Sequence, residues 1–495
     1  MSALQHITAA STNFAKYDAV VVGSGPSGAI TARTLAERGL CVLVLEFGSI
    51  VSPGSTYFEH QAPYSSGFSP SGSLDANPWT ACCVGGGMAF YDAITFRYRD
   101  IDLKPSKYLS SDMNMDWPIV VEDLDENYRY VESLLRVSGS NGIYPFPESL
   151  RGSRIFEAMA SLDINPKRIP LAIDHPEAVN GCFACSPCDE RSCPTDARAS
   201  VRSRRVLDDT DFKGNITTLY GCFVYLVELS SASRGSALEC YVPFSGESLR
   251  IPFDRLFICT NAVQSAALLL RSQSPKAPNG IGNEADLVGR GLSFKVSGYS
   301  VGYSEKWGAT SHFGATHKGP HATVYTDDFY ETVDSPRGIA GLIYEANYAQ
   351  ASDTIGRLRL HYLIGEESWM ANRVLLDDRK DSFGVPYIRF EYRNSENDIA
   401  RIRFLADRAD EILRAAGAKD LDRESSVHSK GSSHLHGTAR AGDDPRMSVV
   451  DRHGRIHGYD NIYVMDGSVM NFAGNSNPTH TIMANARRMS LSVGI

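Results

Sequence analysis

Two apolar runs near the start of the chain flank a segment with the composition of a helix. Residues Ala19–Val22 and Cys41–Leu45 lack polar alternation, which is typical of strands buried on both faces of a parallel sheet. Between them, Ala29–Arg38 has helical periodicity. The pattern therefore predicts a β-α-β unit.

Further along the chain, the hydrophobic pattern predicts more strands and another helix. Asn215–Leu229 and Arg250–Thr260 alternate or run apolar, as strands do, and Asn261–Arg271 is rich in Ala and Leu, as helices are. These segments are expected to belong to the same domain as the first unit.

Three later segments complete the predicted secondary structure. Met113–Gly139 is mostly helical in pattern. Phe294–Ile364 is rich in Tyr, Gly, Thr and Val with turn signals, so we expect a second sheet there. Asp398–Ala416 is a strongly amphipathic helix that Gly417 ends.

Glycines fill the turn between the first predicted strand and its helix. Gly23, Gly25 and Gly28 have G-x-G-x-x-G spacing, and Glu46 ends the next strand near the expected distance of about 20 residues. The glycines let a pyrophosphate approach the helix N-terminus, and Glu46 would accept a hydrogen bond from a ribose hydroxyl. No second unit of this kind follows, so we expect a resident FAD rather than a separate nicotinamide nucleotide.

A second glycine cluster, Gly85-Gly86-Gly87, follows Cys82 and Cys83. Adjacent glycines allow the backbone to approach a ligand or to adopt positive φ. The cluster is therefore either a further cofactor contact, through Gly85 and Gly86, or a plain turn.

Composition narrows the class of protein. A chain of 495 residues with 42% hydrophobic and 22% charged content is expected to be globular, with two or three domains. The net charge of −9 argues against nucleic acid and anionic membranes as partners. No apolar run spans a bilayer and no secretory signal is visible, so we expect a cytoplasmic protein whose ten cysteines are reduced thiols or metal ligands.

Together, these segments resemble the glucose–methanol–choline (GMC) family of FAD-dependent alcohol oxidoreductases over roughly Tyr17 to Met489. The matching stretches include VVVGSGPSGAITARTLAERGLCVLVLEFG, CVGGGMAFYDAITFRYRDID, LFICTNAVQSAALLLRS, HLHGTARAGDD and MDGSVMNFAGNSNPTHTIMANARR. The resemblance implies a mixed α/β protein, with a Rossmann-like FAD-binding domain and a substrate domain built on an antiparallel sheet. It also implies hydride transfer from an alcohol carbon to flavin N5.

The resemblance assigns roles to individual residues. His434, which opens H-x-x-G-T, resembles the family's catalytic base, and Asn477 resembles its partner. Asp466 and Gly467 resemble a contact with the flavin ribityl and phosphate region, and Val224 lies where relatives contact adenine. His436, the other histidine of that motif, falls at a variable position, and its role is left open.

The residues themselves suit this chemistry. Neutral imidazole is a good base for a hydroxyl proton, and an amide holds the same oxygen without titrating. Asn477 is predicted to cap a helix that Pro478 begins and that Thr479–Met489 continues. Its N-terminus, with Thr479 among the cofactor contacts, would face the flavin and stabilise negative charge there.

One departure from the family concerns the attachment of the flavin. Some relatives carry a histidine after the glycine cluster that bonds covalently to it. Phe90 and Tyr91 occupy that neighbourhood here. Non-covalent FAD is therefore expected.

Four cysteines form a tight cluster, C-x2-C-x2-C-x4-C-P: Cys182, Cys185, Cys188 and Cys193. The spacing is close to a run that holds iron–sulfur clusters, although the last gap is one residue longer. An iron–sulfur cluster is the first hypothesis, a zinc ion bound by four thiolates the second, and free or partly paired thiols the third. Iron–sulfur would favour electron relay to an outside acceptor, and hence a dehydrogenase.

The substrate is less well specified. Carboxylates and aromatics around Asp327–Tyr330 suit a sugar, although a solvated acidic loop would look the same. We expect a sugar, polyol or aminoglycoside hydroxyl. A small-alcohol or sterol oxidase, a non-redox lyase on the same scaffold, and a binding protein with a vestigial flavin are the alternatives.

These expectations divide the chain into five parts. Residues 1–150 and 215–293 form the FAD-binding domain, and 151–214 connect them and carry the cysteine cluster. Residues 294–425 form the substrate domain, and 426–495 return to the FAD with the catalytic residues.

Overall fold

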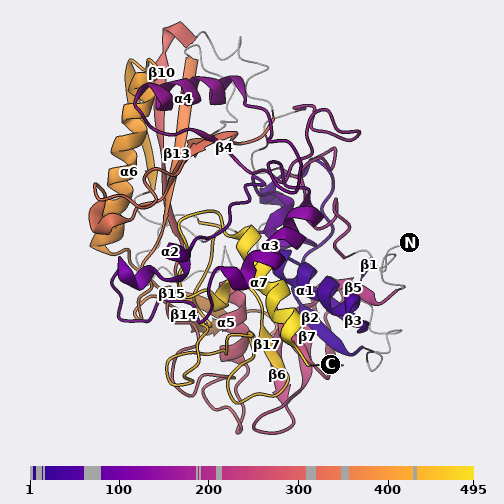
Figure 1. Cartoon of the computed structure of the whole chain (residues 1–495). Coiled ribbons are helices and arrows are strands. Elements are labelled where there is room, and N and C mark those ends of the chain that lie inside the picture. The colour runs from indigo at the N-terminus through magenta and orange to yellow at the C-terminus, as the bar shows by residue number, and fades with distance from the viewer. Residues whose placement is uncertain are drawn as a thin grey trace.

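The computed structural model describes residues 4–6, 14, 17–60, 78, 80–185, 188, 191–207, 214–307, 319–346, 356–426 and 432–494 (Figure 1). The predicted β-α-β unit is present as β2 (Ala19–Val22), α1 (Pro26–Glu37) and β3 (Val42–Glu46). Both strands are fully buried and pair in parallel, as their continuous apolar sequence predicts.

A parallel sheet forms around this unit from segments distant in the sequence. In the part of the chain that the structure describes, its order is β1-β5-β3-β2-β9-β17, and each neighbouring pair is parallel. The added strands are β1 (Leu4–His6), β5 (Ile216–Tyr220), β9 (Leu256–Ile258) and β17 (Ile462–Val464). The sheet therefore collects the two ends and the middle of the chain.

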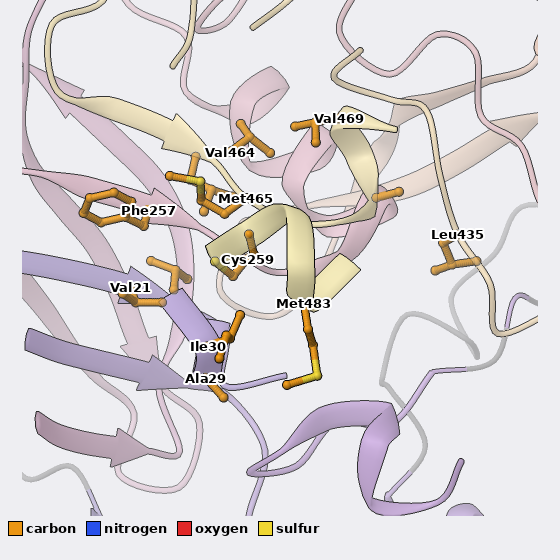
Figure 2. Close-up of a cluster of buried hydrophobic side chains, with 14 of the residues drawn as sticks. Val21, Ala29, Ile30, Phe257, Cys259, Leu435, Val464, Met465, Val469 and Met483 are labelled. Carbon is orange, nitrogen blue, oxygen red and sulfur yellow. The ribbon is translucent and has the colours of Figure 1, made fainter. Parts of the chain in front are cut away.

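Helices α5 (Asn261–Arg271) and α7 (Thr479–Ser492) complete the dinucleotide-binding layer. In Figure 1, yellow α7 lies beside indigo α1, and the two pack together. Figure 2 shows apolar side chains from β2, α1, β9, β17 and α7 meeting in one cluster. A fully buried apolar side chain of this size stabilises the fold by about 1.5–3 kcal/mol. A few such contacts are enough to hold the C-terminal helix against the first unit.

The second sheet is antiparallel and has the order β16-β10-β13-β12-β11-β4 among the described residues. Its strands are β4 (Lys167–Arg168), β10 (Lys295–Ser304), β11 (Val324–Thr326), β12 (Leu342–Glu345), β13 (Gly356–Gly365) and β16 (Asp420–Ser426). Helices α4 (Leu150–Ser161) and α6 (Glu396–Ala415) pack against it at one end of the molecule (Figure 1). The mixed α/β architecture predicted from the sequence is confirmed.

Two smaller sheets flank the first one. A three-stranded antiparallel sheet consists of β6 (Phe223–Leu229), β7 (Gly235–Val242) and β8 (Glu247–Pro252), and a hairpin consists of β14 (Arg373–Lys380) and β15 (Pro386–Glu391). Both β6 and β14 pack against α5. The hairpin comes from the sequence range assigned to the substrate domain, yet it contacts a helix of the FAD-binding layer. Among the described residues, no helix is both long and apolar enough to cross a membrane.

The predicted boundaries of the helices need one change. The helix expected over Met113–Gly139 is α3 (Glu122–Leu135), and the shorter α2 (Asp100–Leu103) precedes it. Trp117 lies before Pro118, a position that disfavours helical conformation, and its N–H donates to the carbonyl of Leu103 instead. The prediction for α6 was accurate, with Ser395 capping its N-terminus and Gly417 at φ +97° after its end.

A buried arginine joins α6 to the antiparallel sheet and to the C-terminal segment. The Arg401 guanidinium pairs with Asp398 at 3.0 Å and donates to the carbonyl of Gly365 and to Oδ1 of Asn475, each at 2.9 Å. Neither Arg401 nor Asp398 is accessible to solvent by more than 1%. Burial raises the pKa of Asp398 to about 6, and the charge of Arg401 opposes that rise.

The structure predicts that removing this arginine is costly. Arg401→Met leaves Asp398 buried without its counter-charge, so the free energy of unfolding is expected to fall by about 3–5 kcal/mol. Arg408→Met on the same helix is the matched control, because Arg408 pairs with Glu411 on the surface. Its effect is expected to stay within about 0.5 kcal/mol. Denaturant titration of both variants measures the difference, and equal stabilities would contradict the role of Arg401.

Candidate active site

A cavity of about 530 Å³ lies at the carboxyl ends of the parallel strands, where ligands bind in open α/β sheets. Most of the predicted site residues line it. Its lining includes Gly23, Gly25, Glu46, Gly86, Val224, His434, Asp466, Gly467 and Thr479. Gly28, Gly85 and Asn477 do not belong to its lining. The structure therefore brings residues from both ends of the chain and from its middle to one ligand space.

The three glycines of the first turn have different tasks. A Cβ on Gly23, which has φ +96°, would lie 2.5 Å from the carbonyl oxygen of Cys259. A Cβ on Gly28 would lie 1.9 Å from the carbonyl oxygen of Gly23. A Cβ on Gly25 would meet no protein atom within 4 Å, so this position leaves room for a ligand at the start of α1. These features fit the phosphates of a dinucleotide.

Glu46 ends β3 and lines the same cavity. Its carboxylate accepts hydrogen bonds from the Ser24 hydroxyl at 2.6 Å and from the Gly48 N–H at 2.8 Å. Burial raises the pKa of Glu46, and these hydrogen bonds limit the rise. The carboxylate is thus fixed where a dinucleotide ribose is held in this type of fold.

The second glycine cluster closes against the first. The N–H of Gly85 donates to the Ser24 hydroxyl at 3.0 Å, and a Cβ on Gly86 would lie 3.0 Å from the Cα of Gly25. Both have positive φ. Gly86 faces the 530 Å³ cavity, whereas Gly85 lines a second cavity beside it. The cluster is therefore a close approach of two backbone segments, and Gly86 is its member at the ligand space.

Two C-terminal motifs meet at Gly467. Asp466 accepts from the Ser265 hydroxyl at 2.6 Å and from the Ser468 N–H at 2.9 Å. A Cβ on Gly467 would lie 2.5 Å from the carbonyl oxygen of Leu435, the residue after His434. The absence of a side chain at Gly467 thus lets the His434 segment lie against the end of β17.

His434 is held as a neutral imidazole. Burial lowers its pKa to about 3, and the nearby charge of Lys295 contributes. At neutral pH the ring is therefore unprotonated, the state from which a general base must start. Burial lowers the pKa of His361, on β13, and the charges of His321, Arg359 and His434 lower it further.

Asn477 is nearly inaccessible to solvent, at 8%, and within the described part of the chain its Oδ1 has no hydrogen-bond partner. It lies beside Tyr344 of β12. Burial raises the pKa of Tyr344 well above its usual value, and Asn477 offsets part of that rise. The His361 ring stands edge-on to Tyr344 at 4.8 Å. Tyr344 and His361 thus connect the region of Asn477 to that of His434.

The predicted capping role of Asn477 is wrong. Helix α7 has Pro478 as its N-cap, without a side-chain cap, and the Ile482 N–H donates to the Pro478 carbonyl at 2.8 Å. Pro478 already has near-helical torsions, and the first turn of α7 forms without a capping hydrogen bond from the side-chain amide of Asn477. The helix also continues past Met489 to Ser492.

His436 and His480, the other histidines of the two C-terminal motifs, are outside the lining of the cavity. His436 is fully buried and its backbone pairs with Ser293 in both directions, at 3.0 and 3.1 Å. His480 is also fully buried, with Nδ1 3.1 Å from the carbonyl oxygen of Thr95. Neither lines the cavity that contains His434.

The four clustered cysteines line one small cavity of about 20 Å³: Cys182, Cys185, Cys188 and Cys193. All four are free thiols. Burial raises the pKa of Cys188 to about 12, whereas hydrogen bonds from Thr195 and Arg198 outweigh burial at Cys193 and lower its pKa. No group of three or more His, Cys, Asp or Glu side chains among the described residues is arranged to hold a metal ion. The iron–sulfur and zinc hypotheses therefore gain no support from the geometry.

Comparison with known proteins agrees with this site. Residues 370–486 match the model of the GMC oxidoreductase family, and residues 21–69 match that of an NAD(P)-binding Rossmann-like domain. The chain is 35% identical to 6'''-hydroxyparomomycin C oxidase of Streptomyces lividus, over 96% of this chain and 91% of that protein. The chain belongs to the GMC oxidoreductase family. It is thus an enzyme that oxidises alcohol CH–OH groups, and the dinucleotide cavity suits FAD.

Other relatives of this GMC oxidoreductase are also named as oxidases or dehydrogenases. Paromamine 6'-oxidase of Streptomyces fradiae is 34% identical over 96% of this chain and 91% of its own length. The 2-methyl-1,2-propanediol dehydrogenase of Mycolicibacterium austroafricanum is 25% identical over 95% and 94%. A crystal structure of pyridoxine 4-oxidase from Mesorbium loti shares the fold, with a TM-score of 0.63 and 18% identity over 96% of this chain and 98% of that one.

No motif or spacing singles out Tyr344, His361 or Lys295. The first two are partners in the register between β12 and β13, and this register is a property of the folded sheet. Lys295 begins β10 and is buried below the C-terminal segment. A period-two pattern could have shown that these residues lie on strands, but not which face of the antiparallel sheet is turned toward the flavin cavity.

Phe90 and Tyr91 both line the cavity where some relatives carry the linking histidine. The FAD of this GMC oxidoreductase is therefore expected to be bound without a covalent link. Precipitation of the protein with acid should release the flavin into the supernatant, where its absorbance is measured. Yellow colour that remains in the washed pellet would show that a covalent bond exists.

Proposed function

We propose that this enzyme oxidises a hydroxyl group of a sugar-like alcohol, with an aminoglycoside as the first candidate. The observation that carries the proposal is the position of His434, a neutral imidazole on the wall of the dinucleotide cavity. Two relatives that are 35% and 34% identical over 96% of this chain are both named for paromomycin-type compounds, and they support the substrate class. Bound FAD supplies the acceptor for the hydride that leaves the alcohol carbon.

His434 and Asn477 divide the work at the hydroxyl group. The imidazole of His434 accepts the hydroxyl proton as the carbon loses its hydride. The side-chain amide of Asn477, whose Nδ2 can donate to the hydroxyl oxygen, holds that oxygen without changing charge. The carbonyl product then leaves with His434 protonated, and the proton passes to solvent.

Helix α7 supports the cofactor end of this arrangement. Its first residues, Pro478 and Thr479, line the cavity. The partial positive charge at a helix N-terminus stabilises negative charge placed there by about 0.3–1 kcal/mol, and more where the site is partly buried. This is the role proposed for Thr479 and its neighbours beside the flavin.

For the electron acceptor we propose oxygen. The expectation of a dehydrogenase depended on an iron–sulfur relay, which the cysteine geometry does not support. The relatives at 34% and 35% identity are both named oxidases, whereas the relative at 25% is named a dehydrogenase. The ten cysteines of the chain are all free, which supports the proposed location in a reducing compartment such as the cytoplasm.

Anaerobic mixing with panels of aminoglycosides, sugars and polyols tests the proposal. A substrate should bleach the flavin absorbance, and admission of air should restore it with consumption of oxygen. A non-redox lyase or a binding protein with a vestigial flavin predicts no bleaching by any alcohol. That result with FAD-loaded protein would refute the proposal.

The assignment of His434 is tested in the same experiment. His434→Ala should retain FAD but slow flavin reduction by about 10²–10⁴-fold, because general-base catalysis contributes that much. Asn477→Ala should lose less, since it orients the oxygen and takes no proton. His436→Ala is the control within the same motif. A larger loss of rate in His436→Ala, with FAD still bound, would show that the assignment is wrong.

The cavity between the four cysteines makes a prediction about metal content. In the described residues, the cavity that the four cysteines line is about 20 Å³, roughly the size for one water molecule, which favours free thiols or a single ion over an iron–sulfur cluster of several atoms. Anaerobically purified protein is therefore expected to contain neither iron nor acid-labile sulfide. Elemental analysis for zinc on the same sample separates a single structural ion from four free thiols. Stoichiometric iron and sulfide would restore the electron relay.

A further inference from the structure

The β14–β15 hairpin contributes to the wall of the dinucleotide cavity. Residues from its turn and from its second strand line that cavity: Asp381, Val385, Pro386, Tyr387 and Ile388. The sequence range of the hairpin was assigned to the substrate domain, and no role in binding the cofactor follows from that assignment. The structure nevertheless places these residues against the space that the cofactor needs.

A row of aromatic rings shows at which end of the cavity the hairpin lies. Glu46, at the position where a dinucleotide ribose is held, is followed by Phe47, whose ring centroid is 5.0 Å from that of Phe223. The Phe223 ring is 5.1 Å from Tyr241, and Tyr241 stacks on Phe383 in the turn of the hairpin, with centroids 3.9 Å apart. The row therefore leads from the ribose position to the hairpin, which lies at the adenosine end of the dinucleotide site.

Asp381 shapes the turn of the hairpin and attaches it to β7. Its Oδ1 accepts hydrogen bonds from the N–H groups of Phe383 and Val385, each at 2.9 Å. Its Oδ2 accepts from the Tyr241 hydroxyl at 3.1 Å. Burial, together with the charge of Asp381, raises the pKa of Tyr241, so the hydroxyl keeps its proton at neutral pH and can donate. This hydrogen bond and the stack of Phe383 on Tyr241 form one attachment of the hairpin.

Arg271, at the end of α5, makes a second attachment. Its Nη2 donates to the carbonyl of Pro386 at 2.9 Å, and its guanidinium carbon lies 5.7 Å from the centre of the Phe223 ring. Burial lowers the pKa of Arg271 to about 10, so the side chain stays charged at neutral pH. Because Arg271 also lines the dinucleotide cavity, the same side chain holds the hairpin and forms part of the adenosine end of the site.

The hairpin depends on these attachments for its position. A two-stranded hairpin is only marginally stable by itself. Phe383 is 42% exposed and does not line the cavity, so its ring serves the attachment and not the ligand. Segments that are held by few contacts open at a lower free energy than the whole fold. The hairpin can therefore separate from α5 and β7 while both large sheets stay intact.

We propose that the β14–β15 hairpin closes the adenosine end of the FAD site, and that its attachments to Tyr241 and Arg271 set the rate at which FAD is released. Opening of the hairpin removes five lining residues from that end of the cavity, whereas the glycine turn and the His434 segment stay in place. The inference goes beyond the proposed function, because it concerns retention of the cofactor and holds whichever alcohol the enzyme oxidises.

The test follows FAD release from the holoenzyme as the rise in flavin fluorescence after dilution. Phe383→Ala removes the stack and should accelerate release by about 2–10-fold, the range of one aromatic pair. Tyr241→Phe keeps the ring but removes the hydrogen bond to Asp381, and it should accelerate release by a similar factor, about 2–10-fold. Tyr144→Ala is the matched control, because Tyr144 is 81% exposed and does not line the dinucleotide cavity. Its release rate should equal that of wild type.

Two further measurements separate opening of the hairpin from a general loss of structure. The absorption spectrum of the bound flavin should be the same in every variant, because the hairpin lies at the other end of the cofactor. In wild-type enzyme, the release rate should depend only weakly on urea, because local opening exposes little surface, whereas the rate of global unfolding, followed by circular dichroism, should rise steeply.

Release with the same urea dependence as global unfolding would overturn the proposal even if no variant folds. Release at the wild-type rate from folded Phe383→Ala and Tyr241→Phe would overturn it as well. A shifted flavin spectrum in either variant would show that the hairpin acts at the flavin end instead, and this too would overturn the proposal.

Discussion

The active site depends on a set of buried charges that anchor one loop. Lys295 lies beneath the C-terminal segment and donates to the carbonyls of Ala473 and Gly474, and its Nζ lies 3.2 Å from the Tyr98 hydroxyl. The Oδ1 of Asn475 accepts a hydrogen bond from the Arg401 guanidinium, and the backbone N–H of Asn475 donates to the Asp102 carboxylate at 2.9 Å. Buried charges of this kind are tolerable only when each has its partners, so the loop has one permitted position.

This constraint explains how two sheets produce one site. Asp102 comes from the FAD-binding part of the chain, Lys295 begins a strand of the antiparallel sheet, and Arg401 is in the helix behind that sheet. All three meet on the loop that leads into Asn477 and α7. The loop therefore sets the distance between the substrate sheet and the flavin cavity. Burial lowers the pKa of Lys295 well below its usual value, a further cost that the surrounding hydrogen bonds must offset.

His434, the proposed base, is placed by close packing rather than by charge. Because Gly467 has no side chain, the Leu435 carbonyl can approach the end of β17, and this fixes the segment that begins with His434. Gly437 lies three positions after His434 in the same motif. A Cβ on it would lie 2.1 Å from the carbonyl oxygen of Gly291. The backbone of this motif is therefore held by close contacts on both sides, and His434 lines the cavity at its start.

Local sequence determined the elements and the cofactor site of this protein. The continuous apolar runs at Ala19–Val22 and Cys41–Leu45 predict buried strands, and the glycine spacing between them predicts the turn that receives phosphates. Both features were predictable because each depends only on residues that are close together in the sequence. Helix α6 was predictable for the same reason. His434 and Asn477 were predicted from their motifs. The structure places His434 on the wall of the cavity and Asn477 beside Tyr344, outside the lining.

The tertiary structure alone decided which distant residues complete the site. Tyr344 and His361 carry no distinctive spacing, and their proximity follows from the register of β12 against β13. The cysteine spacing suggested a metal cluster, but spacing does not determine how four side chains point around a cavity of about 20 Å³. Asn477 was predicted to cap a helix, but the N-cap of α7 is Pro478, which has near-helical torsions. Contacts between distant segments depend on packing that no local pattern encodes, so sequence determined the parts and the fold decided their arrangement.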